Sequence, residues 1–134
     1  MHCYKGFMVP VVAVVDDDNS VRESLESLLR SAGLTVRVFG SAEEFIGSPS
    51  PEMVDCLVLD VRMPGMSGLE LHQRLLAQGC QVPVLFMTAH ASDEQSRAHA
   101  FSQGALAYLL KPFDETELLD AVQMALRSAS GKQV

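Results

Sequence analysis

Short apolar segments rich in β-branched residues recur along the chain, separated by longer mixed segments. Their length and composition are typical of buried strands rather than helices. These segments are Val9–Val15, Leu34–Phe39, Val54–Leu59, Val82–Met87 and Ala105–Leu110. The second alternates apolar and polar positions, as an edge strand does, whereas the first and third are nearly continuous, as central parallel strands are.

The mixed segments between these runs have helical periodicity, and their ends carry helix-terminal signals. Capping boxes, in which a Ser or Asp is followed three residues later by Glu or Gln, predict where the helices begin. They are Ser20 with Glu23, Ser41 with Glu44, Ser67 with Glu70, Ser92 with Gln95, and Asp114 with Glu117. Glycines that would end the helices in a left-handed conformation are Gly33, Gly47, Gly79, Gly104 and Gly131.

Strand and helix alternate too regularly for an all-β or all-α fold. Such alternation predicts a parallel sheet with right-handed crossovers and helices on both faces. The units are too few for an eight-fold barrel, so we expect an open, doubly wound α/β fold of the flavodoxin-like type. It would have five strands in the order 2-1-3-4-5 and five helices. We expect residues 9–128 to form one domain, with an N-terminal tail at 1–8 and a C-terminal tail or linker at 129–134.

Composition and charge narrow the possible functions. The chain has 134 residues, enough for one domain, and its 48% hydrophobic and 20% charged content excludes disorder. A net charge of −7 would repel a phosphate backbone, so we expect no direct nucleic-acid binding. The longest uncharged apolar stretch, residues 7–15, is half a membrane span and has no signal-peptide pattern. We therefore expect a soluble cytoplasmic protein, a location that the unpaired spacing of Cys3, Cys56 and Cys80 also favours.

Polar residues that could bind a ligand or take part in a reaction follow the predicted strands. In open α/β sheets, ligands bind beyond the carboxyl ends of the strands. Asp16, Asp17 and Asp18 follow the first run, Asp60 follows the third, Thr88 the fourth and Lys111 the fifth. Asp18 is expected to belong to the start of the following helix rather than to the site.

Carboxylates gathered on one rim repel one another, by roughly 4 kcal/mol for a pair 4 Å apart at an effective dielectric of about 20. A divalent cation would relieve this repulsion, and a few oxygen ligands with room for water and phosphate suit Mg²⁺. A carboxylate beside Mg²⁺ and a lysine is placed to attack a phosphoryl group.

Four stretches of the sequence together resemble the receiver domain of two-component response regulators. They are VVDDDNSVR (14–22), LVLDVRMPGMSGLEL (57–71), VLFMTAH (84–90) and YLLKPF (108–113). The resemblance implies that Asp60 accepts a phosphoryl group from a sensor histidine kinase. It also implies that Asp16, Asp17, Asp60 and the backbone carbonyl of Arg62 hold Mg²⁺.

The resemblance extends to the residues that would respond to phosphorylation. Lys111 would pair with the phosphoryl oxygens, with a cis bond before Pro112, and Thr88 and Tyr108 would form a switch pair. Arg62 and His90 flank the pocket, where their side chains either tune the lifetime of the phosphoryl group or are plain exposed loop residues. The surface formed by the fourth helix, fifth strand and fifth helix would then change its docking or homodimerisation.

Three alternatives remain open. A haloacid-dehalogenase-like phosphatase also uses an Asp nucleophile and Mg²⁺, but it needs a second Asp where this chain has Arg62. A flavodoxin-like FMN carrier would have no use for the acidic cluster and needs aromatic residues that are scarce here. A degenerate receiver would act by binding alone. On the preferred interpretation the domain catalyses only its own phosphorylation and dephosphorylation, and has no turnover substrate.

The stretch from 57 to 71 is similar to receivers that precede LuxR-type helix-turn-helix domains. We therefore expect the domain to regulate transcription through an output domain absent from this chain, with residues 127–134 serving as the beginning of a linker.

Overall fold

A computed structural model of the chain describes residues 9–48, 54–89 and 94–131. Strands and helices alternate throughout, as the sequence predicts. The elements are β1 (Val11–Val15), α1 (Asn19–Ser31), β2 (Thr35–Phe39), α2 (Ala42–Ile46), β3 (Cys56–Asp60), α3 (Gly68–Ala77), β4 (Val84–Thr88), α4 (Glu94–Ser102), β5 (Ala107–Leu110) and α5 (Glu115–Gly131).

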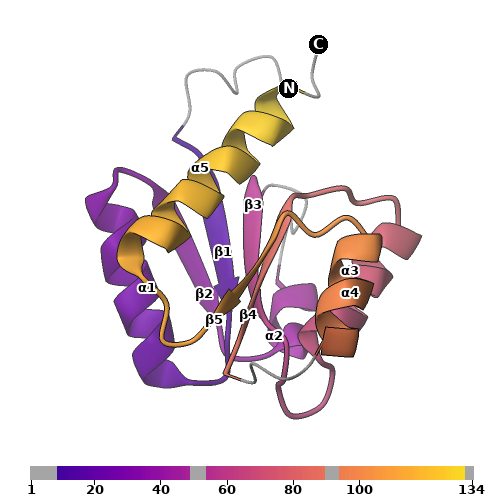
Figure 1. The fold of residues 1–134 in the computed structure, drawn as a ribbon. Coiled ribbons are helices and arrows are strands. Elements are labelled where there is room, and N and C mark those ends of the chain that lie inside the picture. The colour runs from indigo at the N-terminus through magenta and orange to yellow at the C-terminus, as the bar shows by residue number, and fades with distance from the viewer. Residues whose placement is uncertain (1–8, 49–53, 90–93, 132–134) are drawn as a thin grey trace.

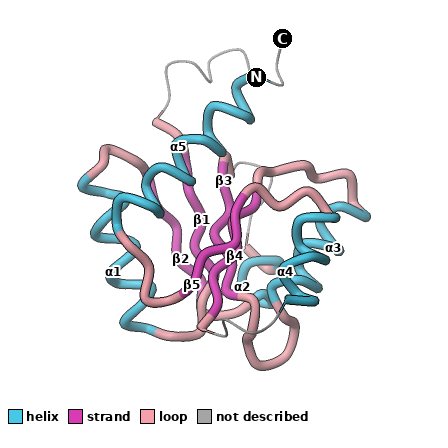
Figure 2. Tube along the Cα trace, viewed as in Figure 1, coloured by secondary structure: helices cyan, strands magenta, loops and turns pink. Residues whose placement is uncertain are grey.

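The strands form one parallel sheet in the order β2-β1-β3-β4-β5, which confirms the predicted topology. Figure 2 shows them side by side in the middle of the molecule. Because all strands run the same way, their carboxyl ends meet at one edge. The register pairs Asp60 with Met87 and Thr88 with Leu110, so the ends of β3, β4 and β5 lie in sequence along that edge.

Helices cover both faces of the sheet and enclose two apolar cores. Figure 1 shows α1 and α5 on one side and α3 and α4 on the other. Leu25 and Leu29 of α1 pack with Leu118 and Val122 of α5 in one core. The other core contains Phe45 of α2 with residues of α3, α4 and the sheet. This two-faced burial explains why β3 and β4 are buried along their whole length.

Four strands begin two residues later than the apolar runs that predict them, and β2 begins one residue later. Conversely, β3 and β4 each extend one residue further, to Asp60 and Thr88. Hydrophobicity alone misplaces the strand ends because the hydrogen bonds between strands are made by the backbone. A polar side chain can therefore occupy the last position of a strand.

The helix-terminal predictions have mixed outcomes. Ser67 and Glu70 form the full reciprocal capping box. Ser41 caps α2, but the Glu44 carboxylate accepts from Gly40 N rather than from Ser41 N. Asp114 accepts from the amides of Thr116 and Glu117, at 2.7 and 3.4 Å, as predicted. The Ser92 box lies outside the described residues.

The predicted box of Ser20 and Glu23 is wrong, because α1 is capped by Asp18. Gly33, Gly79 and Gly104 have the expected positive φ. Gly47 does not: its φ of −76° is helical, and its N–H still donates to Glu43 O. The last helix ends at Gly131, the glycine at which the sequence predicts its end. Within the described ranges, none of the helices has the length and apolar character that a membrane span needs.

Candidate functional site

Three carboxylates meet at the carboxyl ends of two neighbouring strands. Asp16 and Asp17 follow β1, and Asp60 is the last residue of β3. One carboxylate oxygen from each residue lies within 4.8 Å of the others. Asp16 and Asp60 are buried, whereas Asp17 is exposed. The sequence therefore predicted this cluster correctly from the strand ends alone.

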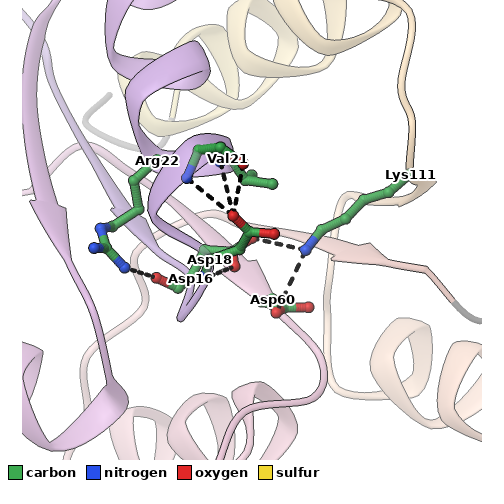
Figure 3. Close-up of polar contacts among 7 residues, drawn as sticks. Asp16, Asp18, Val21, Arg22, Asp60 and Lys111 are labelled. Carbon is green, nitrogen blue, oxygen red and sulfur yellow. Dashed lines mark hydrogen bonds and ion pairs between the residues drawn. The ribbon is translucent and has the colours of Figure 1, made fainter.

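The ammonium group of Lys111 joins two of these carboxylates. Its Nζ lies 2.8 Å from Asp16 Oδ2 and 3.4 Å from Asp60 Oδ2. Figure 3 draws the ion pairs of Lys111 as dashed lines. The backbone holds Lys111 in place because its N–H donates to Thr88 O at 2.8 Å. The peptide bond between Lys111 and Pro112 is cis, as the family resemblance implies.

Burial and neighbouring charges shift the pKa values of Asp60 and Lys111. Burial, and then the charge of Asp16, raise the pKa of Asp60 to about 7, against the opposing effect of Lys111. For Lys111, burial lowers the pKa, but the hydrogen bond and charge of Asp16 and the charge of Asp60 outweigh it, so the pKa is raised. Among the described residues, the Lys111 ammonium pairs with two of the three clustered carboxylates, and carboxylate oxygens of this kind are suitable ligands for Mg²⁺.

The backbone around Asp16 is held by a residue that the sequence analysis did not single out. Arg22 Nη1 donates to Asp16 O at 2.6 Å, and Arg22 Nη2 donates to Asn19 Oδ1 at 2.9 Å. In Figure 3, Arg22 and Lys111 approach Asp16 from opposite sides. The available sequence signal was the position of Arg22 in the first turn of α1, the helix that follows the acidic run.

Asp18 belongs to the helix entry, as predicted. Its Oδ1 accepts from Ser20 N at 2.9 Å, from Ser20 Oγ at 2.8 Å and from Val21 N at 3.4 Å. These hydrogen bonds, first that of the Ser20 side chain, lower the pKa of Asp18. Asp18 N in turn donates to Asp16 Oδ1 at 2.8 Å, so the cap and the acidic cluster share one turn.

The other predicted site residues take varied positions. The backbone of Arg62 donates a hydrogen bond to the Asp60 carboxylate, while its side chain is exposed. Thr88 is 1% exposed at the end of β4. Tyr108 of β5 is half-buried, and its ring lies 6.3 Å from that of Phe86 between centroids. His90 lies outside the described residues.

Gly68, at the start of α3, has a position near Asp60 that the sequence analysis did not foresee. A Cβ on Gly68 would clash with the backbone carbonyl oxygen of Asp60. The Gly68 N–H also donates to Val61 O at 3.0 Å. The start of α3 is thus packed directly against the end of β3.

The cysteines outside the tail lie away from this chemistry. Cys56 is buried at the start of β3, and burial raises the pKa of its thiol to about 12, so it is an unreactive small apolar residue, as predicted. Cys80 is a free, partly buried thiol after α3.

An open α/β domain with an acidic cluster and a lysine at its strand ends is the arrangement that the resemblance to receiver domains implies. A family model described as "Response regulator receiver domain" matches residues 12–123. The chain belongs to the response regulator receiver domain family.

Individual relatives agree with this assignment. Nodulation protein W of Bradyrhizobium diazoefficiens is 47% identical over 115 residues, covering 86% of this chain and 50% of that protein. The transcriptional regulatory protein FixJ of Azorhizobium caulinodans is 46% identical over 124 residues, covering 91% and 58%. The chain therefore spans about half the length of these curated relatives.

Solved structures show the same fold. The response regulator StyR superimposes with a TM-score of 0.87 at 46% identity, covering 94% of this chain and 63% of StyR. The crystal structure named FixJ-N gives a TM-score of 0.79 at 34% identity, covering 90% of this chain and 95% of that one.

Proposed function

We propose that Asp60 accepts a phosphoryl group from the phosphohistidine of a sensor histidine kinase, in a reaction that depends on Mg²⁺. The observation that carries this proposal is the position of Asp60 between the Lys111 ammonium and the neighbouring carboxylates. An aspartate that was only solvated at the surface would not need an ammonium and two further carboxylates beside it.

The donor set fits Mg²⁺, since Asp16, Asp17 and Asp60 offer carboxylate oxygens close together and one of the residues faces solvent. The carbonyl of Arg62 would complete the protein ligands. When bound, Mg²⁺ would neutralise charge on the phosphoryl oxygens and on the carboxylates that surround them.

In the transfer step, an oxygen of the Asp60 carboxylate forms a bond to phosphorus as the bond from phosphorus to the imidazole nitrogen breaks. The imidazole leaves neutral after taking a proton from solvent at its other nitrogen. Lys111 is within reach of Asp60 and would pair with one oxygen of the transferred group. The domain would thus catalyse its own phosphorylation, and water would later remove the phosphoryl group.

Phosphorylation adds about −1.5 to −2 charge and three strong acceptors, and this drives the proposed switch. The Thr88 hydroxyl would donate to a phosphoryl oxygen and draw the end of β4 inward. The ring of Tyr108, which rests against Phe86 on the neighbouring strand, would move into the vacated space. Arg62 and His90 would tune the access of water and hence the lifetime of this state.

The surface of α4, β5 and α5 is the proposed output face. Each element exposes one large apolar side chain: Phe101 is 40% exposed, Leu110 47% and Met124 41%. Association of two copies through this face would cover these side chains. We propose that dimerisation controls transcription through an output domain, of the LuxR type, outside residues 9–128, and that the domain acts in the cytoplasm without binding nucleic acid itself.

Intact mass measurement tests the central step. We expect acetyl phosphate to add one phosphoryl group to the wild type with Mg²⁺, far less without it, and none to Asp60→Asn. If the wild type gains nothing, a phosphohistidine donor is the next reagent. An unchanged phosphoryl gain in Asp60→Asn would contradict the assignment, and sustained hydrolysis of a generic phosphate ester would favour a phosphatase instead.

A further inference from the structure

The carboxylate of Glu43, in the first turn of α2, binds a loop that is distant in the sequence. Glu43 Oε2 accepts a hydrogen bond from Met66 N at 3.0 Å, across 23 residues. Met66 lies in the connection between β3 and α3, on the same loop as Arg62. A side chain of α2 therefore holds the backbone of the loop between β3 and α3.

The loop is shaped to receive this carboxylate. Gly65 has a φ of +78°, and a Cβ at that position would lie 2.9 Å from Glu43 Oε2. A side chain at position 65 would therefore have both an unfavourable backbone conformation and a close contact with the carboxylate. The positive φ is the stronger reason for glycine at 65, because the Glu43 carboxylate is the end of a flexible side chain and could move aside.

The ends of the loop are fixed separately. Val61 N donates to Met87 O at 2.9 Å, and Gly68 N donates to Val61 O at 3.0 Å. Glu43 adds an attachment in the second half of the loop, from a helix that belongs to neither end. The segment from Arg62 to Gly65 is thus held between the sheet on one side and α2 on the other.

Two backbone groups of Arg62 matter to the site. Its N–H donates to the Asp60 carboxylate, and its carbonyl is a proposed ligand of Mg²⁺. We infer that Glu43 is a positioning residue: by holding Met66 it keeps the loop where the Arg62 carbonyl can reach the metal beside Asp60. This inference rests on the proposed function, because it concerns the same metal site.

Magnesium titration by calorimetry separates this role from simple electrostatics. Glu43→Ala removes the acceptor and the charge, whereas Glu43→Gln removes the charge but keeps an oxygen that can accept from Met66 N. We expect Glu43→Ala to bind Mg²⁺ about three- to tenfold more weakly than the wild type, as for the loss of one hydrogen bond. Glu43→Gln is expected to stay within about twofold of the wild type.

Equally weakened Mg²⁺ binding in both variants would mean that only the charge of Glu43 matters, and this would overturn the inference. Mg²⁺ binding by Glu43→Ala with wild-type affinity would also overturn it. If the wild type itself binds no Mg²⁺, the proposed function fails. If the wild type binds Mg²⁺ but Glu43→Ala binds it equally well, only the inference about Glu43 fails. Amide hydrogen exchange without metal provides a second test. We expect faster exchange at Arg62 and Met66 in Glu43→Ala, with Glu43→Gln unchanged, and uniform exchange rates in all three proteins would contradict the inference.

Discussion

The backbone of Gly68 lies against the carbonyl oxygen of Asp60, so closely that no side chain fits between them. The two residues are joined through Val61, whose carbonyl accepts from Gly68 N at 3.0 Å. The first residue of α3 and the last residue of β3 therefore determine each other's position. Because Asp60 is the proposed phosphoacceptor, packing at the start of a helix directly affects the geometry of the site.

Gly68→Ala is expected to destabilise the protein by about 2–4 kcal/mol, because the added methyl meets backbone that cannot rotate away. Thermal or urea unfolding measures this change. Gly33→Ala is the matched control: Gly33 has a φ of +87° but open space around it. It should cost only about 1 kcal/mol, from backbone strain alone. Equal losses in the two variants would mean that the contact with Asp60 has no energetic weight.

Asp60→Asn is expected to stabilise the metal-free protein at pH 8 by about 1–3 kcal/mol, because Asp60 is buried beside Asp16 and the two carboxylates share the Lys111 ammonium. Urea unfolding measures the difference. Saturating Mg²⁺ should stabilise the wild type more than the variant and so reduce the gap. A variant less stable than the metal-free wild type would show that the ion pair with Lys111 outweighs the repulsion between carboxylates.

Asp17→Ala is expected to weaken Mg²⁺ binding by more than tenfold, whereas Asp18→Ala should change it by less than about threefold. The pair is matched, since each variant removes one exposed carboxylate from the same turn. Asp18 instead caps α1, so its loss should lower the free energy of unfolding through the lost helix cap. Calorimetric titration checks the affinities, and equal losses would mean that the metal ligands are wrongly assigned.

The site could be predicted from sequence to the extent that strand ends determine it. Asp16, Asp60 and Lys111 each follow an apolar run, and a parallel sheet brings such positions to one edge whatever the details of packing. The cap of α1 was misassigned because Asp18 and Ser20 are both good capping residues, and sequence preference alone does not choose between them.

The contacts of Glu43 and Gly68 could not be predicted in the same way. Each depends on how a helix packs against a loop or strand end distant from it in sequence. Periodicity shows that α2 and α3 have a buried face, but it does not show which backbone atoms the first residues of each helix meet. The roles of Arg62, Thr88 and Tyr108 remain predictions, because they concern the phosphorylated state.

Lys111→Ala is expected to retain Mg²⁺ binding at least as tight as that of the wild type, because the variant removes a cation that competes for Asp16 and Asp60. The variant should nevertheless lose the response to phosphorylation, since Lys111 would no longer pair with the phosphoryl group. Light scattering of the wild type and variant, with and without acetyl phosphate, compares their association. A phosphorylated variant that dimerises like the wild type would exclude Lys111 from the switch.

His72 gives the protein a pH-dependent stability that is separate from the acidic cluster. It lies on α3, 4% exposed, with its ring 5.6 Å from that of Phe86 between centroids. Burial, and then the nearby charge of His99 on α4, lower the pKa of His72. In the unfolded chain the pKa returns to about 6.5. The contribution of His72 to the free energy of unfolding is therefore complete above pH 6.5. It is lost as the pH falls below 6.5, because the unfolded state takes up the proton first.

His72→Leu removes this titration while keeping an apolar side chain at the position. Urea unfolding from pH 7.5 to 5.5 should show the wild type losing stability relative to the variant as the pH falls. His99→Gln provides the control, because His99 is exposed and shares a 3.0 Å contact with Gln73 beside His72. Without the charge of His99, the pKa of His72 should rise and the pH dependence should become shallower. Parallel pH profiles for the wild type and His72→Leu would mean that His72 is protonated equally well in the folded and unfolded states.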